Sequence, residues 1–172
     1  MASFHLPLRP GPRPRTTAPT RTRPFPHQQL DQLAPEPLQE ALFQRAVRLP
    51  HVWVGRSLVS LPESRAFHLD VEAAKGPAAA FQRKTEFAHI HTDNDGSLHL
   101  TLPPALYDEV KATGWGEPHP VSGTMMLFGP RNAEEVEVAW VILHASWRWA
   151  ATGEASPPVG LPDVAPFDGV DA

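Results

Sequence analysis

The residues best suited to chemistry gather in one segment, residues 86–102, which reads EFAHIHTDNDGSLHLTL. It holds three of the nine histidines of the chain, His89, His91 and His99. Imidazole nitrogens bind Zn²⁺, Fe²⁺, Cu²⁺ and Ni²⁺, and a neutral histidine is also a common general base near neutral pH. The segment is therefore a candidate for a metal centre or for an acid/base site.

The alternation of residue types predicts that this segment is a β-hairpin. In the second strand leucines alternate with polar residues, which leaves His99 and Thr101 on the face opposite the leucines. In the first strand Phe87, His89 and His91 share one face by the same rule. We therefore expect the three histidines to line one face of a strand pair.

The register decides whether the histidines meet. Pairing Ile90 with Leu100 points both apolar faces into one core, places His91 opposite His99 and leaves a three-residue loop that ends in glycine. A two-residue Asp-Gly turn is also chemically allowed, but it shifts the pairing by one residue and moves His99 to the wrong face. The apolar pattern favours the first register. Glu86 faces away in a regular strand, so no carboxylate ligand is obvious.

Elements of both kinds must position this hairpin. Strand-like runs cover residues 51–54, 57–61, 66–71, 86–91, 97–102 and 124–128. Helical patterns cover residues 37–49, 103–110 and 132–147, and the last begins at an Asn132 N-cap with Glu135 three residues on. Strands and helices do not alternate regularly, which favours an α+β fold: a small, mainly antiparallel sheet packed against a long C-terminal helix and shorter helices.

Composition divides the chain into three parts. Residues 1–30 hold five arginines and closely spaced prolines, which predicts an extended, mobile tail. Residues 154–172 hold four acids, no bases and four prolines, which predicts a second disordered tail. Residues 31–153 form the one domain.

Several classes of function are disfavoured. A net charge of -4 gives no general reason to expect nucleic-acid binding, and no run approaches the roughly 20 apolar residues of a membrane span. The absence of cysteine excludes disulfides and thiolate chemistry. Neither a Gly-x-Ser-x-Gly elbow nor a phosphate-binding loop is present. A cytoplasmic location is the default expectation.

Five short motifs occur in a characteristic order. They are EFAHIH at 86–91, LHL at 98–100, GWG at 114–116 with His119-Pro120, PRN at 130–132 with Glu134 and Glu135, and Ala145-Ser146. In order and approximate spacing they resemble the fungal-luciferase-like domain family, over residues 85–153. A fainter likeness reaches residues 64–66.

The resemblance implies an oxygen-dependent reaction. The characterised fungal members oxidise a hydroxylated styrylpyrone with molecular oxygen and emit light as carbon dioxide leaves. Carried over to this chain, the catalytic candidates are His89, His91, His99 and His119, one of them acting as general base on an acidic enol or phenol. The substrate-binding candidates are Glu86, Thr101, Trp115 and Arg131.

Some of these residues have a second interpretation. Glu86 and Arg131 either hold a substrate anion and orient the histidines, or form a structural ion pair. Trp115 either walls the pocket or packs a turn. Trp140 and Trp147 fit the core, which leaves Trp149 as the better tryptophan for a ligand contact.

Three functions follow as hypotheses. The first is an oxygenase of an aromatic enol, with a small aromatic molecule and molecular oxygen as partners. It would work without a cofactor or with a single divalent metal held by His89, His91 and His99. The second is a non-catalytic binding domain for a small aromatic ligand, and the third is a metal-dependent hydrolase.

Overall fold

The computed structural model describes residues 5–18, 27–91 and 95–156. Six strands form one sheet in the order β1-β2-β3-β4-β6-β5, and every neighbouring pair is antiparallel. The strands are β1 Val52–Arg56, β2 Arg65–Leu69, β3 Glu86–Ile90, β4 Leu98–Leu100, β5 Gly116–Pro118 and β6 Met125–Leu127. The helices are α1 Glu36–Ala46, α2 Pro104–Ala112 and α3 Ala133–Thr152, with 3-10 turns at Val71–Ala73 and Ala78–Ala80. The predicted α+β fold with a long C-terminal helix is confirmed.

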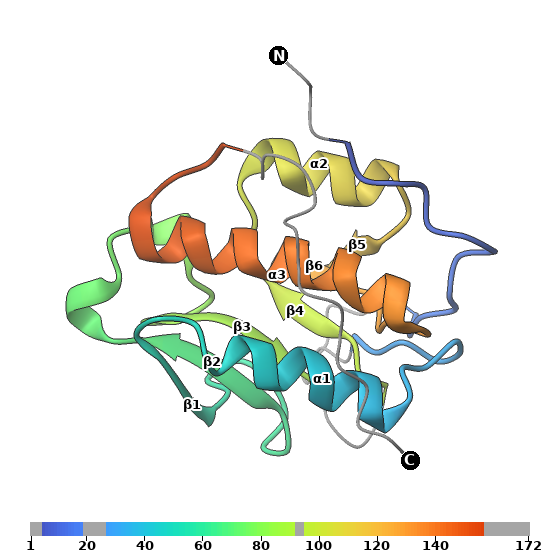
Figure 1. Cartoon of the computed structure of the whole chain (residues 1–172), viewed down its shortest axis with the longest axis horizontal. Helices are drawn as coiled ribbons and strands as arrows, with labels where there is room; N and C mark the ends of the chain where they lie inside the picture. Colours follow the sequence, from blue (N-terminus) through green and yellow to red (C-terminus); the bar gives the residue numbers. More distant parts are fainter. Residues whose placement is uncertain (1–4, 19–26, 92–94, 157–172) are drawn as a thin grey trace.

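The helices cover one face of the sheet. Helices α1 and α3 lie side by side across it, and α2 lies beside β5 (Figure 1). Phe67 and Ile90 from the sheet meet Ile142 and Leu143 from α3 in the core between the two layers. Each of these side chains is fully withdrawn from solvent, so this layer contributes most of the hydrophobic stabilisation.

Helix α3 begins as the sequence predicts. The Asn132 side chain accepts a hydrogen bond from the Glu135 backbone N–H at 2.9 Å, which satisfies one of the free donors of the first turn. The helix ends at Gly153, whose φ of 80° is the left-handed conformation expected after a helix.

Two strand predictions were wrong. Residues 57–61 form a turn because the Ser57 hydroxyl accepts hydrogen bonds from the backbone N–H groups of Val59 and Ser60. Strand β5 was missed, since three residues with a proline give little strand signal. Gly116 makes β5 possible, because a Cβ atom there would lie 2.4 Å from the Met126 carbonyl oxygen.

The described part of residues 1–30 packs on the domain. Leu6 is buried in the core, and the Arg9 backbone N–H donates to the Thr113 carbonyl at 2.9 Å. Trp115 donates through Nε1 to the Pro7 carbonyl at 2.6 Å. The backbone hydrogen bonds within this segment join residues 15–17 to residues 28–30, which leaves the carbonyls of Pro7 and Pro10 available to side chains of the domain. The prediction of a disordered acidic tail concerns mainly residues 157–172, which lie outside the described residues.

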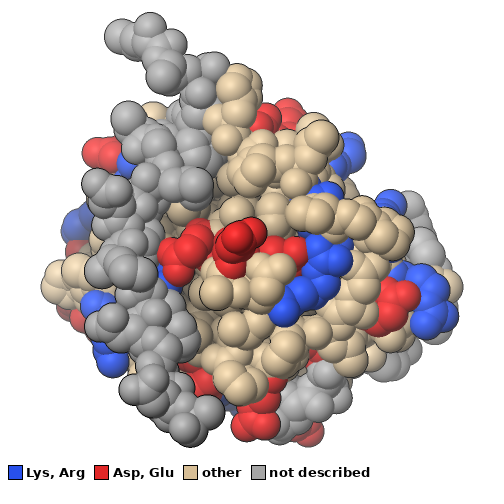
Figure 2. Space-filling view, turned by 45° about the vertical axis from the view of Figure 1, so that its right-hand side comes forward, with Lys and Arg blue, Asp and Glu red and all other residues tan. Residues whose placement is uncertain are grey.

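Charge on the surface is mixed. Figure 2 shows acidic and basic side chains interspersed over one face of the molecule, with other residues between them. None of the helices in the described residues is both long enough and apolar enough to cross a bilayer.

Candidate functional site: a buried histidine cluster

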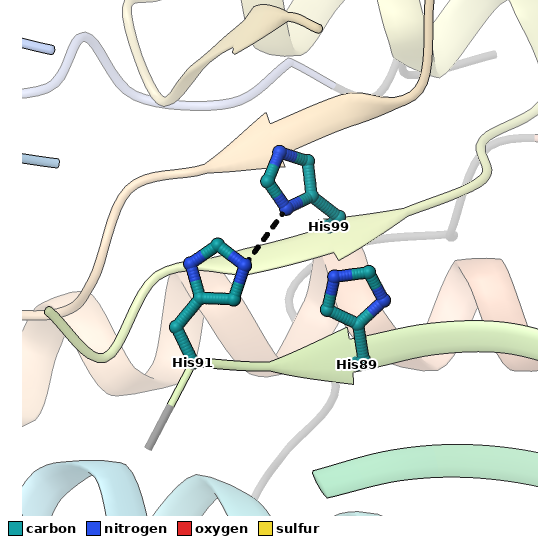
Figure 3. Close-up of side chains that lie close together, drawn as sticks. All are labelled: His89, His91 and His99. Carbon is teal, nitrogen blue, oxygen red and sulfur yellow. Dashed lines mark hydrogen bonds between the residues drawn. The ribbon is translucent and has the colours of Figure 1, made fainter. Parts of the chain in front are cut away.

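The hairpin brings the three histidines together, in a register that differs from the prediction. His89 pairs with His99, and Ile90 pairs with Leu98, so the pairing is shifted by two residues from the expected one. A shift of two keeps every side chain on its face, which is why the histidines still meet. Figure 3 shows His89 on β3, His91 directly after the end of β3 and His99 on β4, all pointing to the same side of the strand pair.

The hairpin loop is longer than predicted because Asp95 is folded inward. Its carboxylate accepts hydrogen bonds from the backbone N–H of Ser97 at 2.8 Å and from the Ser97 hydroxyl at 2.7 Å. It also accepts one from the backbone N–H of Gln29 at 2.7 Å. These bonds stabilise a wider turn with Gly96 at a φ of 68°, so the three-residue loop does not form.

A β-bulge in β3 overturns the prediction that Glu86 faces away. Phe67 pairs with Ala88 and the next residue, His68, pairs with Glu86, so Phe87 is an extra residue in the ladder. The bulge turns Phe87 into the core, where its ring centroid lies 6.3 Å from that of Phe67. Glu86 is thereby turned to the histidine face, and its carboxylate accepts from His89 Nδ1 at 3.0 Å.

His99 is the centre of the cluster. Its Nδ1 lies 3.2 Å from His91 Nε2 (Figure 3), and its ring centroid lies 5.2 Å from that of His89. One ring nitrogen of each of these three histidines lies within 4.8 Å of those of the other two. All three side chains are buried.

A fourth histidine, His27, joins the cluster from the N-terminal segment, by which we mean residues 5–18 and 27–30. Its Nδ1 lies 2.8 Å from His99 Nε2, and its Nε2 lies 2.9 Å from a carboxylate oxygen of Glu117 on β5. Glu117 is also contacted by the Arg13 guanidinium. No motif in the sequence marked His27, because its neighbours at the site are 72 and 90 residues away in the chain. Glu117 lies between the GWG and His119-Pro120 parts of one motif, so its position two residues before His119 was the signal that could have identified it.

Each histidine of the cluster has an acceptor or another ring behind it. His89 Nδ1 faces the Glu86 carboxylate. His91 Nδ1 lies 3.4 Å from the Asp95 carboxylate and 3.2 Å from the Ser97 hydroxyl. Such contacts fix the tautomer and the ring orientation of a histidine. They leave His89 Nε2 buried without a hydrogen-bond partner in the described part of the chain.

Burial and hydrogen bonding shift the pKa values in the cluster. Burial lowers the pKa of His27 to about 4, helped by the nearby His119 and His91. Burial also lowers the pKa values of His89 and His99, the latter well below its ordinary value. These rings are therefore neutral at pH 7.

The two buried acids keep their charge. Burial alone would raise the pKa of Glu86, but hydrogen bonds from His89, the Leu58 backbone N–H and the Ser57 hydroxyl outweigh it and lower the pKa. The pKa of Asp95 is lowered in the same way, since bonds from His91 and Ser97 outweigh its burial. The site thus combines the neutral rings of His27, His89 and His99 with ionised carboxylates.

His119 lies at the edge of the cluster. Its ring centroid is 5.0 Å from that of His27 and 5.5 Å from that of His99. Its Nδ1 accepts hydrogen bonds from the backbone N–H groups of Val121 and Ser122, both at 3.1 Å. A neutral His119 therefore carries its proton on Nε2.

The other predicted site residues lie in structural contacts. Thr101 donates to the Ala80 carbonyl at 2.7 Å, and Trp115 is buried in the core. Arg131 forms an ion pair with Glu135 and donates to the Pro10 carbonyl at 2.7 Å. Trp149 is also a core residue. For Arg131 and Trp115 the structural interpretation fits these contacts, and Glu86 is the member of this group that touches a histidine.

A surface cavity adjoins the cluster on the side of the N-terminal segment. Its volume is about 630 Å³, and its lining includes His27, Glu117, Pro120 and residues 13–18. A small aromatic molecule fits such a volume. His27 separates this cavity from His99.

Comparisons with known proteins place this site in a family. Residues 84–146 match the family model described as "Luciferase domain". The chain is 30% identical over 164 residues to a luciferase of Armillaria gallica, which covers 82% of this chain and 59% of that protein. It is 39% identical over 72 residues to luciferases of Armillaria ostoyae and Neonothopanus nambi, which covers 37% of this chain and 27% of each relative.

The chain thus spans less than two thirds of the length of these relatives. The solved structures give no significant match. The matched region contains His89, His91, His99 and His119, together with Glu86 and Asp95, whereas His27 lies outside the family model. The chain belongs to the fungal luciferase-like family.

Proposed function

We propose that this protein catalyses the oxidation of a small aromatic enol or phenol by molecular oxygen at the histidine cluster. One observation carries the proposal: within the matched region, His89 presents a buried Nε2 without a hydrogen-bond partner in the described residues, while its Nδ1 is held by Glu86. That arrangement is typical of a general base whose tautomer is fixed by a carboxylate. The name of the relatives, luciferase, supports oxidation as the class of reaction.

The first step would be proton abstraction. His89 carries its proton on Nδ1, so its Nε2 lone pair accepts the hydroxyl proton of the enol. The resulting enolate is electron-rich, and its carbon can form a bond to oxygen while O₂ is reduced to the peroxide level. Glu86 stabilises the imidazolium that forms, because its carboxylate lies 3.0 Å from Nδ1.

Substrate would approach through the cavity beside His27. His27 and Glu117 line it and also border the cluster, so a ring in this cavity lies one side chain away from His99. His89 is buried and does not line the cavity, so proton transfer to His89 would require the His27 side chain to move aside. His119 would border a substrate in this cavity, because its ring centroid lies 5.0 Å from that of His27.

The test is oxygen uptake with a hydroxylated styrylpyrone as probe. We expect uptake by the wild-type chain, with light emission recorded in parallel, and loss of uptake by at least about 100-fold in His89→Gln. His51→Gln is the matched control, because His51 is exposed and bonded to Asp70, away from the cluster.

Binding must be measured in the same samples. If tryptophan fluorescence shows that the probe binds and oxygen uptake stays at background, the oxygenase proposal fails and a binding domain is the better description. If hydrolysis of the probe is detected in its place, the metal-dependent hydrolase replaces it.

A further inference from the structure

We propose that His89, His91 and His99 hold one divalent transition-metal ion, with Glu86 and Asp95 as the charged groups behind the ligands. The proposal rests on the proposed function for the role of the ion in oxidation, and it changes one step of it. With the ion bound, His89 Nε2 is a ligand and no longer a base, so the ion would acidify a bound enol and the enol proton would pass to solvent. The binding of the ion itself is argued from proton counting, from charge and from geometry.

The proton count leaves three nitrogens bare. A neutral imidazole carries one proton. His89 uses it toward Glu86, and His91 uses it toward Asp95 and Ser97. His27 uses its proton toward Glu117, so the 2.8 Å contact between His27 Nδ1 and His99 Nε2 must take the proton of His99.

His91 Nε2 and His99 Nδ1 then face one another at 3.2 Å with two lone pairs and no proton. His89 Nε2 is the third bare nitrogen, buried in the same cluster. Lone pairs that face each other repel unless a proton or a metal ion lies between them. An additional proton on His91 would still leave His89 Nε2 without a hydrogen-bond partner in the described residues. A metal ion bound to these three nitrogens satisfies every contact with neutral rings.

Charge points the same way. Glu86 and Asp95 are both buried, and each accepts hydrogen bonds only from neutral groups and histidines. Among the described residues no lysine or arginine forms an ion pair with either of them. Two buried carboxylates without a cation are costly. A divalent ion beside the rings that they contact would balance both.

The geometry suits a small ion with imidazole ligands. Two nitrogens about 2.05 Å from a tetrahedral centre lie roughly 3.3 Å apart, close to the 3.2 Å between His91 Nε2 and His99 Nδ1. The widest separation within the group, inside 4.8 Å, must contract to about 4 Å or less, which rotation of the side chains allows.

Three protein ligands leave a coordination position open. His119 is not suited to fill it, because its Nδ1 already accepts two backbone N–H bonds and its Nε2 carries the proton. His27 holds the outer nitrogen of a ligand and so acts as a positioning residue. An open position is the feature that separates catalytic sites from structural ones.

The first experiment measures Co²⁺ binding to the untagged full chain after treatment with a chelator. We expect about one ion per chain, with visible absorption bands of Co²⁺ in a nitrogen-rich site. The absence of binding at millimolar Co²⁺, and of binding in a parallel titration with Zn²⁺, would overturn the proposal.

The second experiment identifies the ligands without any substitution. In ¹⁵N-labelled protein loaded with Zn²⁺, the ring-nitrogen signals of Nε2 in His89 and His91 and of Nδ1 in His99 should move to values typical of metal-bound nitrogen. Signals that report a different set of nitrogens would contradict the proposed site.

Two variants sharpen the assignment. Glu86→Gln keeps the shape of the side chain and removes its charge, so Co²⁺ affinity should fall by about 10- to 100-fold. His51→Gln should bind Co²⁺ like the wild type. Equal affinity in Glu86→Gln and wild type would contradict the charge argument.

The two proposals can fail separately. Missing Co²⁺ and Zn²⁺ binding overturns the metal site whether or not oxygen is consumed. Stoichiometric metal without turnover of any enol probe overturns the oxidation and leaves the metal site standing.

Discussion

The β3–β4 hairpin and the N-terminal segment both supply histidines to the cluster, and they are built on different principles. His89, His91 and His99 come from two strands joined by a short loop, so their positions follow from local alternation and pairing. His27 is placed by contacts with residues far away in the chain, such as His99, and by the bond from its neighbour Gln29 to Asp95. The hairpin supplies the ring nitrogens of His89, His91 and His99, and the N-terminal segment packs against them through His27.

This difference between the hairpin and the N-terminal segment suggests which part of the site can vary among members of the family. The hairpin lies within the luciferase-domain match, and the N-terminal segment lies outside it. A segment held by carbonyls of prolines and a few side chains can change with less effect on the core than a strand can. We therefore expect the hairpin to set the chemistry and the segment to set access to it.

The largest effect should come from the hairpin side. Glu86→Ala leaves the Ser57 hydroxyl, the Leu58 backbone N–H and His89 Nδ1 without their acceptor. We expect a loss of about 3 kcal/mol in the free energy of unfolding of the metal-free protein, measured by urea denaturation. A loss below about 1 kcal/mol would mean that Glu86 contributes little to holding β3.

A smaller loss is expected where the hairpin loop packs against Ala34 and against the Gln39 side chain of α1. Gly96 has a φ of 68°, and a Cβ atom there would lie 2.7 Å from Ala34 Cβ and 2.7 Å from atoms of the Gln39 side chain. Gly96→Ala should therefore cost about 2 kcal/mol of unfolding free energy. Gly123→Ala is the matched control, because its φ of 73° carries similar strain while the substituent meets no atom within 4 Å. Equal losses in both variants would show that backbone strain alone, and not the contact with Ala34 and Gln39, is responsible.

A pH-dependent effect follows from the buried imidazoles. The folded pKa of His27, about 4, lies below its ordinary value of 6.5, so the unfolded chain binds more protons between these values. Stability of the metal-free protein should be fully present above about pH 6.5 and should fall as the pH drops toward 4. His27→Gln should reduce that slope, and an unchanged slope would indicate that His89 and His99 account for it.

The smallest effect is expected for Arg131. Its guanidinium joins Glu135 to the Pro10 carbonyl and the Gln32 side chain, away from the histidines. Arg131→Gln should lower the unfolding free energy by about 1 kcal/mol and leave Co²⁺ affinity unchanged. A tenfold loss of Co²⁺ affinity would show that the N-terminal segment controls the site as strongly as the hairpin does.

Much of the fold could be predicted from local pattern. The α+β class, the long helix capped by Asn132 and the shared face of His89, His91 and His99 all follow from residue periodicity. The register was missed by two residues because it depends on Asp95, whose partner Gln29 is 66 residues away. His27 could not be predicted for the same reason, since its contacts with His99 and Glu117 leave no spacing in the sequence. Glu117 had a local signal that was not used, because it lies two residues before His119 and alternate residues of an extended chain share a face.

The bulge at Phe87 has a consequence for anyone who searches genomes for this site. In a flat strand, a carboxylate three residues before a histidine lies on the face opposite to it. Glu86 and His89 nevertheless lie on the same face and form a hydrogen bond, because Phe87 is an extra, bulged residue between them. A profile that scores strict alternation would discard such sequences. Such a search should require the complete Glu-x-x-His spacing within a strand. A sequence that lacks one residue of this spacing should be treated as lacking the site.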